Sequence, residues 1–249
     1  RLFISLVLFA TLFHGLARSA PGPAAALFER DWQWRLEHHP EYATTLGERR
    51  YNDRLSDTSL AAVRARRDHL RTMLDEARAL DRAGLSAQEK LSLDLFVFGK
   101  ERQLALLAFS AVNPQLLTSW DGLPVRLPRL VAQTPFATED DYRNYLARLN
   151  ALPAHVDGLI EQLREGMRSG WTAPKASVRK VPELLRALRE GLNEGPLSAP
   201  LRRIPATIDA KVREELLAAG NAALNDSAAP ALRRLEEFVR NDYLPAARD

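Results

Sequence analysis

Histidine and cysteine are residue types that often carry catalysis or bind metals, and this sequence offers few of them. It has no cysteine and five histidines, which are His14, His38, His39, His69 and His155. No two histidines lie four residues apart, so the HExxH pattern that places two zinc ligands on one helix face is absent. His38 and His39 are adjacent and would point about 100° apart on a helix, so this pair offers one metal ligand at most. The alternative, which we expect, is a solvated helix end where the dipole favours cations.

Other motifs with a defined mechanism are also missing. The sequence contains no GxSxG, no GxxxxGK[ST] and no GxGxxG. Glu139, Asp140 and Asp141 form an acidic cluster that suits either a metal ion or the first turn of a helix, and the apolar repeat after them favours the helix. We therefore predict no catalytic residue, no metal ligand and no cofactor within this chain.

The segment 109–136 contains the candidate substrate-binding residues. Four prolines interrupt it and only three of its residues are charged. A long connection with so few charges is costly to leave in water, so we expect an irregular, proline-rich loop that packs on the helices and lines a cleft. Trp120, Arg126 and Arg129 are then the candidates for substrate binding, with the arginines placed to meet a peptide carboxylate. The alternative is an ordinary buried loop with two surface arginines.

Helical periodicity dominates the rest of the chain. Apolar residues at spacings of three and four predict one buried seam, formed by Tyr142, Tyr145, Leu149, Val156, Leu159 and Leu163. The expected helices cover residues 24–39, 41–46, 60–80, 86–107, 138–167 with a kink or break at Pro153, 174–192, 205–224 and 232–243. No alternating strand pattern is present. We predict an all-α fold, a multi-helix antiparallel array or bundle with one long proline-rich loop.

The charge balance gives no case for nucleic-acid binding. Lysine and arginine number 35 and aspartate and glutamate 32, which gives a net charge of +3. Without Arg1 and Arg18 the count is 33 against 32, so the remainder is almost neutral. We therefore expect no nucleic-acid partner.

The first twenty residues are typical of a secretory signal peptide. A basic residue, Arg1, precedes an apolar run that is too short for a membrane span, and small residues follow it. Ala17 and Ser19 fit the small-x-small rule for cleavage after Ser19. We predict that residues 1–20 are the signal peptide, that residues 21–249 form the helical region, and that the protein is exported, periplasmic or secreted, with no membrane association after cleavage.

Several stretches, taken in order, resemble the bacterial DUF885 proteins. The pieces that carry the resemblance are LFERDWQWRL at 27–36, PEYATTLG at 40–47, YNDRL at 51–55, PF at 135–136, DYRNYLARL at 141–149, LREGM at 163–167, GWTAP at 170–174 and YLPAARD at 243–249. They cover nearly all of the chain after the signal peptide.

This resemblance implies a helical, exported, gluzincin-like zinc metallopeptidase. In that family an HExxxGHH-like motif lies downstream of the stretch matched here, where histidines would hold zinc and a glutamate would activate the bound water. The chain stops before that point, so no family catalytic residue maps onto it. We expect residues 21–249 to be the N-terminal part of a peptide hydrolase, inactive alone, that binds peptide together with a missing C-terminal half. The alternative is a stand-alone helical binding or scaffold domain without enzymatic activity.

Overall fold

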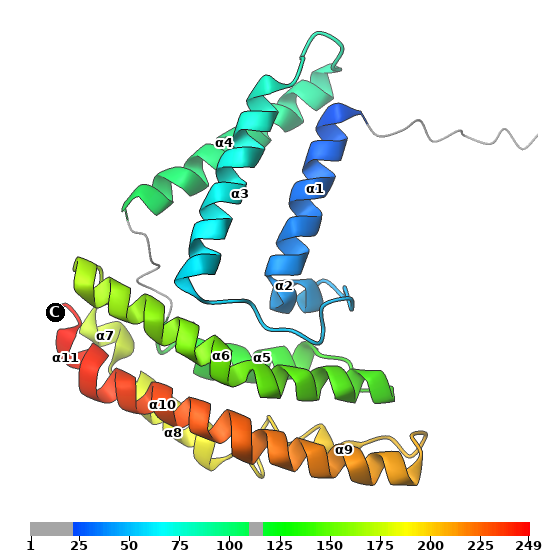
Figure 1. The fold of residues 1–249 in the computed structure, drawn as a ribbon, viewed down its shortest axis with the longest axis vertical. Coiled ribbons are helices and arrows are strands. Elements are labelled where there is room, and N and C mark those ends of the chain that lie inside the picture. The colour runs from blue at the N-terminus through cyan, green and yellow to red at the C-terminus, as the bar shows by residue number, and fades with distance from the viewer. Residues whose placement is uncertain (1–21, 110–116) are drawn as a thin grey trace, which may run out of the picture.

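The computed structural model describes residues 22–109 and 117–249, which form two groups of helices (Figure 1). The predicted signal peptide, residues 1–20, lies outside the described residues. Within the described ranges the regular elements are helices without strands, which confirms the all-α prediction. The elements are α1 (Pro23–His38), α2 (Pro40–Thr45), α3 (Leu60–Ala79), α4 (Ala87–Phe109), α5 (Leu123–Gln133), α6 (Glu139–Ser169), α7 (Lys175–Val178), α8 (Val181–Glu190), η1 (Leu201–Arg203), α9 (Ala210–Ala222), η2 (Ala223–Ala228), α10 (Ala229–Phe238), η3 (Val239–Tyr243) and α11 (Leu244–Ala246).

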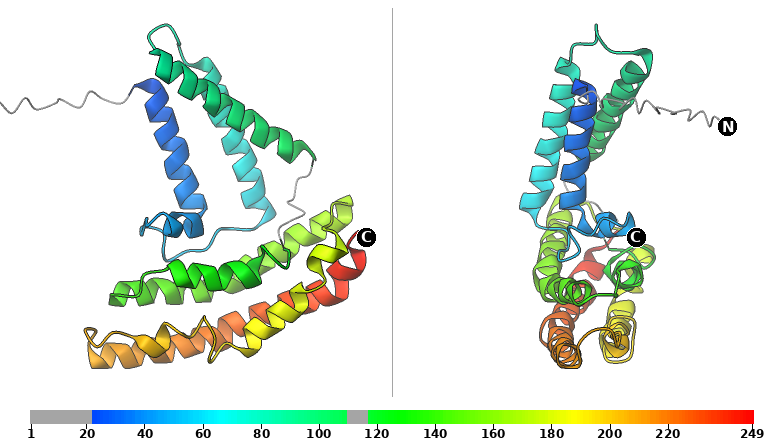
Figure 2. Two further views of the ribbon diagram at one scale, coloured as in Figure 1. Left: turned by 180° about the vertical axis from the view of Figure 1, so that it is seen from behind. Right: turned by 90° about the vertical axis from the view of Figure 1, so that its right-hand side faces the viewer.

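Helices α1, α3 and α4 form a layer that we call the arm, which projects from the other helices in both views of Figure 2. A small apolar cluster holds it together, and its buried members are Leu27, Met73, Ala77 and Leu93. Ion pairs Arg78–Glu101 and Arg82–Asp94 join α3 and the residues just after it to α4, and the later arginine pairs with the earlier acidic residue. The helices expected at 60–80 and 86–107 therefore form an antiparallel hairpin.

Helices α5 to α11 form the body, whose central helix is α6. The Thr138 hydroxyl accepts the backbone N–H of Asp141, whose carboxylate accepts that of Thr138, which completes a capping box. The six residues predicted along the α6 seam are each at most 4% exposed, which confirms them as core. Burying each of these side chains contributes roughly 1.5–3 kcal/mol.

The body also contains a parallel helix pair. Asn150 of α6 lies beside Ser227, and Asp157 lies beside Arg234 of α10, so both contacts join residues 77 apart. A constant separation means that α6 and the α9–α11 stretch run in the same direction. Residues 170–209, which include α7 and α8, follow α6 in the sequence and lead the chain back to the other end of the body, where α9 begins (Figure 1). This return makes the parallel arrangement possible within a helical array expected to be antiparallel.

The stretch from Ala210 to Ala246 is one continuous helix with two π-helical segments. The segment η2 comes just before Pro230, and η3 comes just before Pro245. A proline in a helix lacks an N–H and clashes with the carbonyl of the preceding turn, so a widened turn there relieves the clash. The gap expected between the helices at 205–224 and 232–243 is absent, because the helix widens at Asn225 and Asp226 instead of ending.

Three boundary predictions differ from the structure. Of the kink or break expected at Pro153, the break is absent, because packing along α6 outweighs the one hydrogen bond that proline loses. Pro205 does not start a helix, since α9 begins after Asp209, whose carboxylate accepts the N–H groups of Lys211 and Val212. Part of the expected irregular loop 109–136 is helix α5, because Pro124 sits in the first turn, where its missing N–H costs nothing.

Candidate functional site

The three predicted binding residues lie at the start of α5 and along it. Trp120 is 60% exposed, and Arg126 and Arg129 are also exposed. The two arginines are three residues apart on one helix and therefore share a face. Trp120 directly precedes Asp121, whose carboxylate binds Arg126. We call the three predicted residues, which are exposed at and before α5, the α5 surface. Whether it binds substrate stays a prediction.

A tight turn positions this surface. The Thr118 hydroxyl accepts the backbone N–H of Asp121 at 3.0 Å, and the N–H of Ser119 donates to the carbonyl of Ser177 at 2.9 Å. Gly122 ends the turn, where a Cβ would lie 2.9 Å from the carbonyl oxygen of Thr118. Leu117 is 1% exposed and anchors the turn in the core. Trp120 is therefore presented to solvent by a backbone that is fixed on both sides.

Arg126 already has an anionic partner on this surface. Its Nε and Nη2 donate to the two carboxylate oxygens of Asp121, both at 2.7 Å. This hydrogen bonding, together with the charges of Arg126 and Arg129, holds the pKa of Asp121 below its usual value. Within residues 22–109 and 117–249, Arg129 forms no ion pair. Arg129 is therefore the better placed of the two cations to meet an incoming carboxylate.

The arm contains a second cluster of chemically capable side chains, which sequence reasoning missed. The Asp31 carboxylate lies 2.9 Å from Nε2 of His69 and 2.6 Å from Nζ of Lys100, and these residues come from α1, α3 and α4. Their side chains are only 9–17% exposed. The spacing of these residues in the sequence could have revealed the cluster. Each polar residue lies four or seven positions from a buried apolar residue of its own helix: Asp31 from Leu27, His69 from Met73 and Lys100 from Leu93. Each polar residue thus falls on the core face of its helix.

Trp34 of α1 stacks against two imidazole rings, one of which is the His69 ring of this cluster. The rings of His38 and His69 stack on it, each with a centroid distance of 3.9 Å. Nδ1 of His38 also lies 2.9 Å from the Trp34 carbonyl oxygen. His38 and His39 do end α1, as predicted, but both are partly buried. The expectation of a solvated pair is therefore wrong, because aromatic stacking and α2 cover this helix end.

Burial sets the charge state of these histidines. It lowers the pKa of His39 from 6.5 to about 4, and the charge of Arg66 acts in the same direction. Burial also lowers the pKa of His69, against the opposing effect of the hydrogen bond that its Nε2 makes to the Asp31 carboxylate. Both side chains are therefore neutral in the folded protein near neutral pH.

Stability should fall as the pH drops from about 6.5 to about 4, because the unfolded chain then binds a proton that folded His39 does not. For His39 we expect a loss of about 2 kcal/mol, which is less than the full shift implies because the ring is partly exposed. Urea unfolding at about pH 7 and about pH 4.5 measures this loss in the wild type and in His39→Gln. The wild type should lose about 2 kcal/mol more than the variant, and equal losses would contradict the assignment.

The described residues do not fit a zinc site. Within them, no group of three or more histidine, aspartate or glutamate side chains could hold a metal ion. A catalytic zinc needs three protein ligands and an open position, whereas the Asp31 cluster offers one carboxylate that is already engaged by two nitrogen donors. No catalytic step through zinc follows from these residues.

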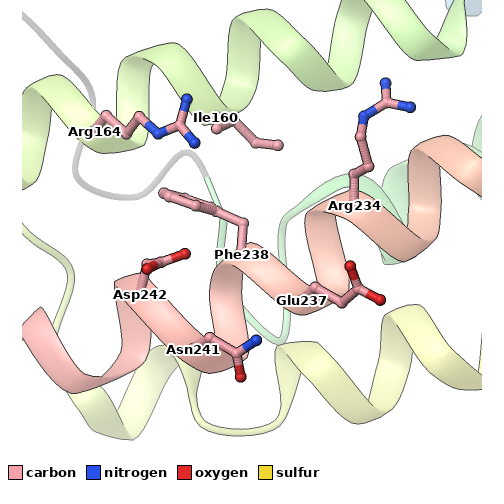
Figure 3. Close-up of a pocket in the computed structure, with 7 residues that line it drawn as sticks. All are labelled: Ile160, Arg164, Arg234, Glu237, Phe238, Asn241 and Asp242. Carbon is pink, nitrogen blue, oxygen red and sulfur yellow. The ribbon is translucent and has the colours of Figure 1, made fainter.

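One open pocket, of about 340 Å³, lies between α6 and the end of α10 (Figure 3). Arg164 and Ile160 line it from α6, and the Arg164 guanidinium lies 5.2 Å from the centre of the Phe238 ring. Asn241 and Asp242 come from the π-helical segment η3. Two arginines, Arg164 and Arg234, and two acidic residues, Glu237 and Asp242, thus line the pocket together with the Phe238 ring.

The fold and these sites define an all-helical protein. Among the described residues, the main candidates for function are the α5 surface and the buried cluster of Asp31, His69 and Lys100. None of the described helices is both long and apolar enough to cross a membrane.

The chain belongs to the family described as "Bacterial protein of unknown function (DUF885)", which matches residues 40–249. It is also similar to a solved structure, "The crystal structure of the putative lipoprotein from Colwellia psychrerythraea", with a TM-score of 0.82 and 16% sequence identity. The likeness covers 90% of this chain and 41% of that one, so the chain spans about two fifths of the solved protein's length. At this identity the likeness shows the fold alone. No curated protein matches the chain.

Proposed function

We propose that these residues are the N-terminal helical part of a longer, exported peptide hydrolase. One observation carries the proposal: the fold matches 90% of this chain but only 41% of the solved protein, with a TM-score of 0.82. A similar protein thus uses this helical array as less than half of its structure. The ordered resemblance of residues 27–249 to the DUF885 proteins supplies the hydrolase class and zinc as its metal.

In this proposal the chain binds substrate and does not perform the chemistry. The α5 surface offers an exposed indole and an exposed guanidinium, which suit an apolar side chain and a carboxylate of a peptide. Residues outside this chain would hold zinc, which would supply a Lewis acid and an activated water. The role of Trp120 and Arg129 is to orient the peptide.

The proposal includes export. Residues 1–20 have the pattern of a signal peptide, and the similar solved protein is described as a lipoprotein, a class of exported protein. The 249 residues contain no cysteine for lipid attachment. The mass of the exported product tests this part, and an N-terminus near Ala20 or Pro21 is the expected result.

The second candidate is a stand-alone helical binding domain. Its support is the buried core of the body, a continuous cluster of residues between Leu117 and Tyr243. Such a core could stabilise the helices of the body by itself. The hydrolase proposal and this alternative differ in the length of the gene product and in peptide turnover.

The whole gene product, purified after export, should hydrolyse quenched fluorescent peptides and lose that activity with a zinc chelator. In the same assay Arg129→Ala should raise KM about tenfold or more, because a charge-assisted hydrogen bond to the substrate is lost. Arg168→Ala is the matched control, since Arg168 is an exposed arginine on α6 whose partner is Glu165. A product of only these residues that binds peptides without cleaving them would support the binding domain instead.

A further inference from the structure

Helix α4 carries large apolar side chains on two opposite faces. One face packs in the arm through Leu93, with Phe96 and Val97 beside it. The opposite face carries four large apolar side chains that are 53–62% exposed, and they are Leu91, Leu95, Phe98 and Leu106. They follow one another at spacings of four, three and eight residues, so they lie along one face, with the exposed Arg102 between Phe98 and Leu106. We call these four apolar residues the α4 stripe. Apolar side chains on one face of a helix normally pack against another element, and on α4 two faces carry them.

Ion pairs fix the direction in which the stripe faces. Asp94 and Glu101 bind Arg82 and Arg78 at the α3 side of the helix. These pairs hold α4 against α3 in one rotation, so the stripe does not turn into the arm. Its apolar area is on the order of 400 Å², because a fully exposed leucine or phenylalanine has roughly 200 Å². Exposed apolar patches of several hundred Å² are often functional.

We infer that the α4 stripe is the docking surface for the part of this same polypeptide that follows Asp249. This inference rests on the proposed function, in which the chain is part of a longer protein. The similar solved protein has more than half of its length outside the match, so a longer protein with this fold has further residues available to cover the stripe. The C-terminus lies at the end of the body toward which α4 descends, which places following residues near the stripe (Figures 1 and 2).

A segment of the same chain suits the stripe better than a second copy does. A stable interface between separate proteins buries about 800 Å² on each partner, of which a little over half is apolar, so the stripe would supply nearly all the apolar area of such an interface. A tethered partner needs less area, because its effective concentration is already high. The tether therefore favours an intramolecular occupant.

These 249 residues contain no cysteine, so any thiol that peptide mapping finds within them is one introduced by substitution, which permits a direct test by thiol labelling. Leu95→Cys and Phe98→Cys each place a thiol in the stripe, and Leu217→Cys on α9, at a residue 41% exposed, is the matched control. Maleimide labelling of the monomeric whole gene product is followed by peptide mapping. Both stripe thiols should react on the order of tenfold more slowly than the control, because thiol reactivity requires exposure.

Each outcome separates the inference from the proposed function. Equal labelling rates in a product longer than this chain would overturn the inference and leave the proposed function standing. A product with the mass of these residues alone would overturn both. Protection that appears only when the protein dimerises would assign the stripe to a second copy and would also overturn the inference. Circular dichroism confirms that each variant keeps the helical content of the parent.

Discussion

Replacing Arg148 with methionine should lower the free energy of unfolding by about 3 kcal/mol, although methionine has a similar length and is apolar. Arg148 is only 2% exposed. Its Nε donates to the Arg54 carbonyl at 2.9 Å, and its Nη2 donates to the Thr44 hydroxyl at 2.6 Å. Longer bonds reach the carbonyls of Pro40 and Tyr51. One guanidinium on α6 thus binds α2 and the linker between α2 and α3, residues 46–59. Methionine can replace none of these hydrogen bonds.

The Arg148 site is a hydrogen-bonded charge without a carboxylate partner among the residues that the structure describes. Burial lowers the pKa of Arg148 to about 10, while Glu41 and Asp53 act in the opposite direction. The side chain is therefore still charged near neutral pH, and its stability depends on the carbonyl and hydroxyl oxygens around it. Lysine should not rescue the variant, because an ammonium cannot donate to several divergent acceptors at once.

Arg143→Ala is the matched control for this prediction. Arg143 lies on the same helix but is exposed and pairs with Glu139 four residues away. Such pairs contribute about 0.3–0.5 kcal/mol, so its loss should be small. Urea unfolding measures both variants, and similar losses for Arg143→Ala and Arg148→Met would show that Arg148 does not hold the linker.

Periodicity made the α6 seam and the α3–α4 hairpin predictable. Tyr142, Leu149 and Val156 recur at seven-residue spacing, and any helix that buries one of them buries all three. The charged residues beside such seams were harder to place. Arg148, Asp31 and Lys100 lie at positions that the period assigns to the core, yet charge alone suggests solvent. Their burial depends on partners far away in the sequence, which a local pattern does not contain.

The direction of α9 to α11 and the helical character of α5 depended on tertiary context as well. The parallel contact of α6 with α10 requires the return through α7 and α8, which spacing within either helix does not reveal. For α5, the two prolines argued against regular structure. Pro124 occupies the first turn, and the helix tolerates Pro128 because Leu127, Leu130 and Val131 are buried against the body. The exposure of Trp120, Arg126 and Arg129 does not test their predicted role in substrate binding, because exposed residues occur both in binding sites and on the rest of a protein surface.

Replacing Gly158 with alanine should destabilise the protein by about 2–3 kcal/mol, although alanine is the better helix former by about 1 kcal/mol. Gly158 lies in α6 where the linker to α3 crosses it. A Cβ there would lie 2.5 Å from the Thr58 hydroxyl and 2.7 Å from the backbone N of Ser59, so the linker itself would have to move. That movement would break two bonds, from the Thr58 hydroxyl to the His155 carbonyl and from Gln162 to the Thr58 carbonyl.

Gly99→Ala provides the opposite case within the same protein. Gly99 lies in α4, and no atom beyond its chain neighbours and its own helix backbone is within 4 Å of the position that its Cβ would take. Alanine there should stabilise the protein by about 0.5–1 kcal/mol, because only the helix propensity changes. Thermal unfolding of the two variants should therefore shift the midpoint in opposite directions relative to the wild type. A stabilising effect of Gly158→Ala would mean that the linker does not lie on α6, and the junction between arm and body would then need a different arrangement.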